Sequence, residues 1–330
     1  MKKTVSRIQV VGITLLLLAV VLPNLAAGAN FRLKDTQGKH LDVLLNGNTV
    51  ARYMYAYDKS TKDTLHETYK PYLHVYDPTG QRPITKGAGG KYTHHRGIFI
   101  GWNKMQFQGQ SYDRWHMKGG EQIHQRFLNQ KAGKSGASFT SLVHWNDSEG
   151  KPILEEQRSM TFKSAPSPAY VFIEFSTQLK AVRGDIDLDG DPEHAGVQFR
   201  PANEVVIDET IYVFPQAQAD PKKDRDYTWV GETFTLDNRH FSVIHLNHPS
   251  NPKDTIYSAY RNYGRFGAFF KHNMKAGQIL MLRYGFLIRE GEMFDAATIQ
   301  TQWDSFAGRT TPSAVPTLTV TGGVQKGKKK

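Results

Sequence analysis

Three polar residues stand directly before a short apolar run in "KYTHHRGIFIGW", which spans residues 91–102. If residues 98–102 form a strand, it would hold His94, His95 and Arg96 rigidly at its entrance. Alternate side chains of a strand point to opposite faces, so His94 and Arg96 would share one side and His95 the other. Imidazole can transfer protons and guanidinium can hold an anion. A polar loop whose histidines cap backbone groups is the equally weighted alternative.

A second cluster follows in "DRWHMKGGEQIHQRF", residues 113–127. His116 and His124 flank a Gly-Gly turn, so a hairpin could bring them together, and Glu121 lies between them. Imidazoles and a carboxylate can act as acid–base groups or bind a borderline metal. The spacing matches no compact metal motif such as HExxH. The sequence therefore leaves the metal and any other cofactor unspecified.

Further polar residues lie at turn–strand junctions in "DPEHAGVQFRP", "HLNHPSNP" and "YRNYGRFG". A single histidine in such a place is more often structural, but several clusters favour a site because strand ends converge on one rim. We assign acid–base roles to His95, His124, Glu121 and His194. We assign ligand binding to His94, Arg96, Trp102, His116, Arg200, His248, Arg261 and Tyr263. We expect one pocket to hold His95, His124, Arg200 and His248.

The elements that position these residues are predicted to be strands. Apolar and polar residues alternate through most of the chain, and Asn46-Gly47 is typical of a type I′ hairpin turn. In residues 171–179 every second side chain is predicted to share one face. One stretch, residues 292–308, has helical spacing, with Ile299, Trp303 and Phe306 on one side. These patterns predict an all-β fold, a large antiparallel β-sandwich with one short helix near the C-terminus, in a single domain over 30–310.

The two ends of the chain predict export and a basic tail. Residues 1–29 combine a basic start, an apolar run and small residues, which is typical of a signal peptide, with a retained anchor as the alternative. Residues 311–330 are predicted to be a mobile basic tail. The net charge is +11, but most of it lies in these two segments, which argues against a nucleic-acid partner. No later segment is long enough to cross a membrane. We expect a periplasmic or secreted protein.

Five segments in order resemble a bacterial domain family labelled "methane oxygenase PmoA", over residues 35–290: "THHRGIFIGW", "RWHMKGGEQIHQRF", "EHAGVQFRP", "NHPSNP" and "YRNYGRFGAFF". The positions that match the family pattern are His95, His124, Arg200, His248, Arg261 and Tyr263. Ser258 and Ala259 stand where many members have Trp-His, so that histidine's role is not carried over. The label does not indicate a methane monooxygenase, whose subunit has several membrane spans. The resemblance implies a galactose-mutarotase-like supersandwich and a setting in carbohydrate breakdown.

Three functions remain open on the sequence alone. The first is a carbohydrate-active enzyme that acts on a sugar or oxidised sugar by His/Glu acid–base chemistry, through epimerisation, elimination or hydrolysis. The second is a non-catalytic module that binds a glycan or another anionic ligand through its arginines. The third is a structural envelope protein. In the first two, the partner is a carbohydrate or other small molecule.

Overall fold

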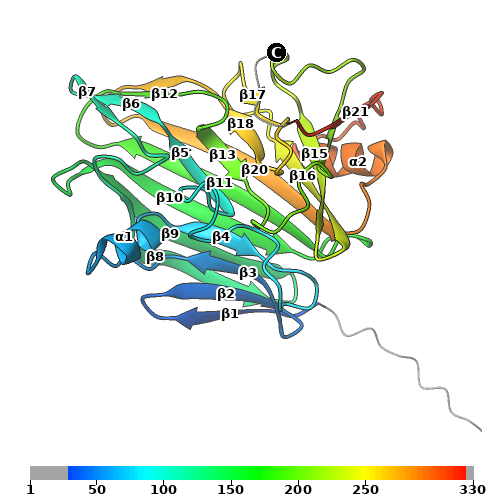
Figure 1. The fold of residues 1–330 in the computed structure, drawn as a ribbon, viewed down its shortest axis with the longest axis horizontal. Coiled ribbons are helices and arrows are strands. Elements are labelled where there is room, and N and C mark those ends of the chain that lie inside the picture. The colour runs from blue at the N-terminus through cyan, green and yellow to red at the C-terminus, as the bar shows by residue number, and fades with distance from the viewer. Residues whose placement is uncertain (1–28, 325–330) are drawn as a thin grey trace, which may run out of the picture.

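The computed structural model describes residues 29–324, which form three sheets and two helices (Figure 1). The first sheet has the strand order β1 (Phe31–Thr36), β2 (His40–Leu45), β3 (Asn48–Met54), β4 (Tyr72–Val75), β5 (Ile98–Trp102), β13 (Ala195–Phe199), β18 (Phe266–Phe269) and β17 (Ile256–Tyr257). The second has the order β21 (Thr319–Gly322), β14 (Ile211–Phe214), β15 (Trp229–Leu236), β16 (Arg239–Asn247), β20 (Ile279–Glu290), β11 (Val171–Ala181), β10 (Pro152–Lys163), β9 (Gly136–Asn146) and β8 (Gln122–Gly133). The third has the order β19 (His272–Met274), β12 (Ile186–Asp189), β6 (Lys104–Phe107) and β7 (Gln110–Tyr112).

The two large sheets pack face to face around one apolar core. The ring of Tyr53 on β3 lies 4.9 Å from that of Phe139 on β9, and Phe199 on β13 lies 6.2 Å from Phe234 on β15. On β11 the side chains at 171, 173, 175, 177 and 179 are all buried, as their alternation predicts. The predicted antiparallel β-sandwich is therefore confirmed.

The turn at Asn46-Gly47 joins β2 to β3, as the sequence predicts. Both residues adopt positive φ, 53° and 93°, which a type I′ turn requires and which Asn and Gly tolerate best. The turn sets the register in which Leu45 pairs with Asn48. Local turn chemistry thus fixes which side chains of β2 and β3 face the core.

The predicted C-terminal helix is confirmed as α2 (Ala296–Phe306), which packs Ile299, Trp303 and Phe306 onto the outer face of the nine-stranded sheet. A second helix, α1 (Lys62–Thr68), was not expected. It has no buried side chain, so it lacks the apolar spacing that reveals a helix in sequence. Thr61 caps it through a hydrogen bond from the Thr64 backbone N–H.

The C-terminal prediction is wrong for part of the predicted tail. Residues 319–322 form strand β21, which pairs with β14 at the edge of the nine-stranded sheet, so the sandwich extends past residue 310. Val324 then bridges to Arg261. The rest of the tail, 325–330, and almost all of the predicted signal peptide lie outside the described residues. Within 29–324, neither helix has the length and apolar character needed to cross a membrane.

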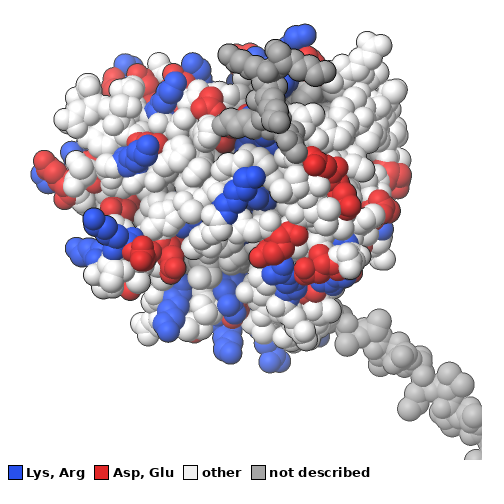
Figure 2. All heavy atoms as spheres, viewed as in Figure 1, with Lys and Arg blue, Asp and Glu red and all other residues white. Residues whose placement is uncertain are grey.

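Charged side chains of both signs are interspersed over the face of the molecule that Figure 2 draws. Among residues 29–324, one exposed ion pair joins Arg82 with Asp237. Exposed pairs of this kind contribute little to stability. The charge pattern of this face therefore gives no reason to place a binding site on it, and the site has to be sought among the partly buried polar groups.

Candidate metal centre

Three loops bring the imidazoles of His94, His116 and His194 together. His94 precedes β5, His116 follows β7, and His194 precedes β13. The ring of His94 lies 4.2 Å from that of His116 and 6.4 Å from that of His194, and the last two are 5.5 Å apart, between ring centroids. One ring nitrogen from each residue lies within 4.8 Å of the others. All three histidines are partly exposed, so a small ligand can reach them.

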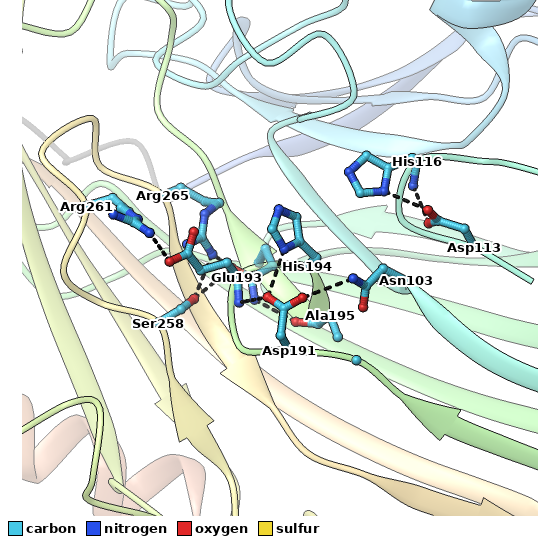
Figure 3. Close-up of polar contacts among 12 residues, drawn as sticks. Asn103, Asp113, His116, Asp191, Glu193, His194, Ala195, Ser258, Arg261 and Arg265 are labelled. Atoms are coloured by element: carbon cyan, nitrogen blue, oxygen red, sulfur yellow. Dashed lines mark hydrogen bonds and ion pairs between the residues drawn. The ribbon is translucent and has the colours of Figure 1, made fainter. Parts of the chain in front are cut away.

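Two aspartates fix the orientation of two of these rings (Figure 3). Nδ1 of His116 lies 2.8 Å from Oδ2 of Asp113, and Nδ1 of His194 lies 2.8 Å from Oδ1 of Asp191. An ionised carboxylate can only accept a hydrogen bond, so Nδ1 must carry the proton in both rings. Nε2 is then the nitrogen of each ring that can offer a lone pair to a ligand. This carboxylate–histidine arrangement is the one that orients histidine ligands in metalloproteins.

Both carboxylates are held in the ionised form that this arrangement needs. Burial alone would raise the pKa of Asp191, but the hydrogen bond and charge of His194 and the bond from Asn103 outweigh it and lower the pKa to about 2. The pKa of Asp113 is also lowered, because hydrogen bonds from the ring and backbone of His116 outweigh its burial. Both aspartates therefore remain acceptors across the working pH range.

His94 completes the cluster as a neutral imidazole. Burial lowers its pKa to about 2, and the nearby charges of His116, Lys70 and His194 act in the same direction. Its Nε2 atom is buried and has no hydrogen-bond partner among residues 29–324. An unsatisfied buried nitrogen is unfavourable, and a ligand at that position would relieve it. The His94 ring is therefore uncharged, and its Nε2 atom is free to bind a ligand.

Three imidazoles with convergent ring nitrogens suit a borderline divalent ion such as zinc. Structural zinc sites have four protein ligands, whereas three histidines leave one position open for water or substrate. Nitrogen ligands of a tetrahedral zinc lie about 3.4 Å apart when each bond is about 2.1 Å. The ring nitrogens of the cluster lie within 4.8 Å of one another, so small rotations of the rings can reach this spacing. Within residues 29–324, no other group of three or more His, Asp or Glu residues brings its potential ligand atoms within 4.8 Å of one another.

A carboxylate between two arginines lies next to the histidine cluster (Figure 3). Glu193 forms an ion pair with Arg261, lies 3.9 Å from Nη2 of Arg265 and accepts a hydrogen bond from Tyr260 at 3.2 Å. Burial would raise the pKa of Glu193, but the hydrogen bond from Arg261 and the charge of Arg265 outweigh it, so the pKa is lowered. Glu193 is therefore an anion, suited to accept a proton and not to donate one.

His95 packs behind His94, with the two ring centroids 4.4 Å apart. The expected alternation across a strand fails, because residues 91–97 form a turn that folds back over β5, where His95 meets Trp115. His95 is 2% exposed, and burial keeps its pKa well below the usual value. It contacts the cluster from the protein side, so an acid–base role for it stays a prediction that the geometry does not favour.

The predicted arginines are mostly buried and hold backbone carbonyls. Arg96 donates to the carbonyl oxygens of Thr93, His95 and His66, which anchors the loop that carries His94. Arg200 donates to those of Pro201, Ala202 and Tyr263, and its guanidinium lies 4.9 Å from the Tyr263 ring centroid. The assignment of Arg96 and Arg200 to ligand binding is therefore wrong in its role, because both have spent these donors on the loops around the cluster.

Trp102 is fully buried, so its assignment to ligand binding is also wrong. Its side chain lies with those of Ile98 and Ile100 on the face of β5 that packs into the main core, and its Nε1 donates to the carbonyl of Phe270. Phe99, on the opposite face, packs with Trp115 beneath the histidine loop. The histidine cluster therefore lies on the outer face of the eight-stranded sheet.

The expected single pocket for His95, His124, Arg200 and His248 is wrong. His124, on β8, lines a cavity with Asp35 and Tyr55, and His248, after β16, contacts Arg283 and the ring of Phe306. The Gly-Gly hairpin does not pair His116 with His124, since His116 turns back to Asp113. Glu121 immediately precedes β8, where its carbonyl accepts from the Asn146 N–H. Two of the four residues therefore lie at separate places in the sandwich.

The sequence analysis missed the two aspartates that orient the cluster. Both lie three residues before a histidine, in "DRWH" and "DPEH". In each case the carboxylate also accepts backbone N–H groups two or three residues on, as Asx turns do. The repeated Asp-x-x-His spacing is the signal that would have revealed them.

The fold and the cluster together define an antiparallel β-sandwich with three convergent histidines on the outer face of one sheet. Residues 40–304 match a family model described as a family of unknown function (DUF6807), and the chain belongs to that family. This description states no activity, so the methane oxygenase label remains a resemblance. No curated protein matches the sequence.

The solved structures with distant similarity include a heparan sulfate lyase and a protein assigned as an aldose 1-epimerase. Heparan sulfate lyase HepC from Pedobacter heparinus matches with a TM-score of 0.37 and 9% identity, over 81% of this chain and 36% of the lyase. A protein assigned as an aldose 1-epimerase from Escherichia coli K12 matches with a TM-score of 0.35 and 8% identity, over 80% of this chain and 100% of its own. The chain thus spans about a third of the lyase. At these scores the similarity concerns the fold alone.

Proposed function

We propose that the protein is a metal-dependent enzyme that acts on a carbohydrate at the cluster of His94, His116 and His194. The observation that carries this proposal is the convergence of three imidazoles, two of them oriented by ionised aspartates. A structural role for the cluster would leave the buried Nε2 of His94 without any function. We also propose that the chain is exported, on the composition of residues 1–29.

A divalent ion on three histidines supplies Lewis acidity toward a carbonyl or hydroxyl oxygen of the substrate. The protein supplies an anionic carboxylate, Glu193, directly beside His194 in the chain. Tyr92, which is partly exposed and has its ring 5.4 Å from that of His95, supplies an aromatic side chain near the cluster. Sugar rings offer apolar C–H faces to such side chains and hydroxyl groups to the surrounding polar atoms. These features together suit a polyhydroxylated substrate.

The charge state of Glu193 selects among the reactions that the sequence left open. Hydrolysis by the usual glycosidase route requires a protonated carboxylic acid and a second carboxylate across the cleft. Glu193 is ionised by its arginine partners, so it does not supply that acid. As an anion it can accept a proton from a carbon beside a carbonyl, where its lowered pKa makes it a weak base. Delivery of a solvent proton to the other face of that carbon gives epimerisation, and loss of a neighbouring oxygen substituent as an alcohol or water gives elimination. We therefore favour these two reactions over hydrolysis.

The alternative of an anion-binding module has less support. It depended on free arginines, but Arg96 and Arg200 each donate to three backbone carbonyls, and Arg261 is paired with Glu193. These bonds use only part of each guanidinium, because Nε of Arg96, Arg200 and Arg261 has no partner among residues 29–324. Those Nε atoms are buried, however, so they do not face a ligand in solvent. A purely structural role in the envelope would require neither the aspartates that orient His116 and His194 nor the unpaired Nε2 of His94.

Deuterium exchange tests the proposal. The chain 30–330 is stripped with a chelator, reloaded separately with Zn²⁺, Co²⁺, Ni²⁺ or Mn²⁺, and incubated in D₂O with aldoses, keto sugars and uronic acids. Proton NMR should show deuterium uptake or a new product only with metal, and His116→Gln and Glu193→Gln should abolish it. Asp187→Asn, an exposed residue on β12, is the matched control. Equal turnover without metal, or sugar binding without any exchange, would contradict the proposal.

A further inference from the structure

A second cavity lies at the edge of the sandwich and shares no residue with the histidine cluster. Its volume is about 470 Å³, and it is formed by β1, the segment after β3, and β8. β1 and β8 are the edge strands of the two large sheets, and they contact each other (Figure 1). The residues that matter for its chemistry are Asp35, Tyr55, Tyr57, His124, Arg126 and Phe127.

His124 is held at this cavity by a buried chain of hydrogen bonds. Its Nδ1 lies 2.6 Å from Oγ of Ser141, and the hydroxyl of Tyr53 donates to the same oxygen at 3.1 Å. Ser141 and Tyr53 are fully buried between the sheets. Because Tyr53 donates to Ser141, the Ser141 hydroxyl hydrogen is free to donate to Nδ1, which leaves Nε2–H of His124 as a donor. Buried polar chains of this kind fix one side-chain orientation.

The cavity combines aromatic faces with groups that donate and accept hydrogen bonds. The rings of Tyr55 and Phe127 each lie 4.5 Å from that of His124. The Tyr55 hydroxyl donates to Oδ1 of Asp35 at 2.5 Å, so Asp35 keeps an oxygen that can accept from a ligand. Arg126 offers further donors. The lining holds one carboxylate and one guanidinium, and this balance favours a neutral ligand over a charged one.

The backbone of β8 is distorted where it borders the cavity. Its register against β9 shifts between His124 and Arg126 and again between Phe127 and Asn129. Bulges re-aim side chains and are over-represented next to functional sites and at sheet edges. The need to protect an exposed sheet edge would be enough to explain the bulges. It would not explain a buried Tyr53–Ser141–His124 chain that serves only to orient one imidazole.

We propose that this cavity is a second ligand site, one that binds a neutral pyranose ring of a carbohydrate. A sugar hydroxyl both donates and accepts, so it can bond with the Asp35 carboxylate and the His124 N–H, while the ring stacks on an aromatic face. The site lies apart from the histidine cluster, so it binds without the metal. It would hold a chain of sugars whose other end extends past the open edge of the sandwich.

Saturation-transfer NMR tests this site with the metal-free chain 30–330. The probes are methyl glucopyranosides, methyl galactopyranosides, cellotriose and maltotriose. At least one should receive saturation from the protein, and Tyr57→Ala should weaken its binding about tenfold, the loss of a single good contact. Tyr57 is partly exposed, so its removal leaves the core intact, which circular dichroism can verify. His124→Asn, which deletes the oriented N–H donor, should weaken the same probe.

Two controls separate this site from the metal centre. His116→Gln should leave probe binding unchanged, and Asp187→Asn matches Asp35→Asn in charge at an exposed position of β12. The proposal is overturned if no probe receives saturation, or if binding survives both Tyr57→Ala and Asp35→Asn. It is also overturned if His116→Gln removes binding, since the sugar would then occupy the histidine cluster. The metal-dependent exchange described above is a separate readout and does not depend on this result.

Discussion

Neutralising one of the two aspartates should weaken metal binding without removing a ligand. Asp191→Asn keeps the size of the side chain, and its oxygen can still accept from Nδ1 of His194. It removes the negative charge that stabilises the proton on Nδ1 and makes Nε2 a better donor to a cation. Its NH₂ group would also face Nδ2 of Asn103, which now lies 3.0 Å from Oδ2, so Asn103 must turn its amide. Asp113→Asn makes the same change beside His116.

The loss can be estimated from the burial of the two carboxylates. Substitutions of residues that orient histidine ligands lower metal affinity about 10–100-fold, which corresponds to about 1.4–2.7 kcal/mol. The side chain of Asp191 is 43% exposed, so water compensates for part of its charge, and we expect about a tenfold loss. The side chain of Asp113 is 17% exposed, which places it near the upper end of that range. Asp113→Asn should therefore weaken binding more than Asp191→Asn.

Competition with a chromophoric chelator measures both affinities for Zn²⁺, with Asp187→Asn as the control of equal charge change. Thermal melts of the metal-free variants separate a loss of affinity from a loss of folding. The reasoning is refuted if both substitutions change the affinity less than twofold, or if the control loses as much as either. A larger loss for Asp191→Asn than for Asp113→Asn would show that burial does not set the magnitude.

Three predictions concern stability. Glu156→Gln should lower the free energy of unfolding in denaturant by about 3–5 kcal/mol, because it leaves the buried charge of Arg158 without its partner. The control Glu155→Gln, one residue away and exposed, should lower it by less than about 1 kcal/mol. Equal losses would contradict this. Acid should destabilise the fold. Burial lowers the pKa of His245 to about 3, below its unfolded value of about 6.5. The contribution of neutral His245 to the free energy of unfolding is therefore complete above pH 6.5, and about 2 kcal/mol of it is lost by pH 5. A free energy of unfolding that does not change between pH 7 and pH 5 would refute this. Deleting residues 319–330 removes β21 from the edge of its sheet and should lower the melting temperature by several degrees, as calorimetry can show, while an unchanged melt would mean that this strand adds nothing.

The parts of the fold that local sequence determines could be predicted. The hairpin at Asn46-Gly47 depends on two adjacent residues that tolerate positive φ, and the face of α2 depends on apolar residues within two turns. The helix α1 could not be found in this way, because nothing in it is buried. Strand β21 was missed because its alternating side chains are only partly buried at a sheet edge.

The site was predictable in its residue types but not in its arrangement. All three histidines of the cluster stood among the candidates, but so did His124 and His248, which end elsewhere. Their separation depends on which sheet each strand joins and on how residues 91–97 fold back over β5, and both are set by contacts between segments far apart in sequence. The sequence pattern likewise does not reveal that Arg96 is buried against backbone carbonyls. Such roles follow only from the three-dimensional packing.

A cobalt titration tests the central proposal most directly. Co²⁺ reports its coordination through visible absorption, and it binds the same nitrogen ligands as zinc. The metal-free chain 30–330 should bind one Co²⁺ per chain with an absorption band of a nitrogen-ligated ion. His94→Gln, His116→Gln and His194→Gln should each remove that band while the protein stays folded. No bound Co²⁺, or a band that persists in all three variants, would contradict the assignment of these histidines to a metal centre.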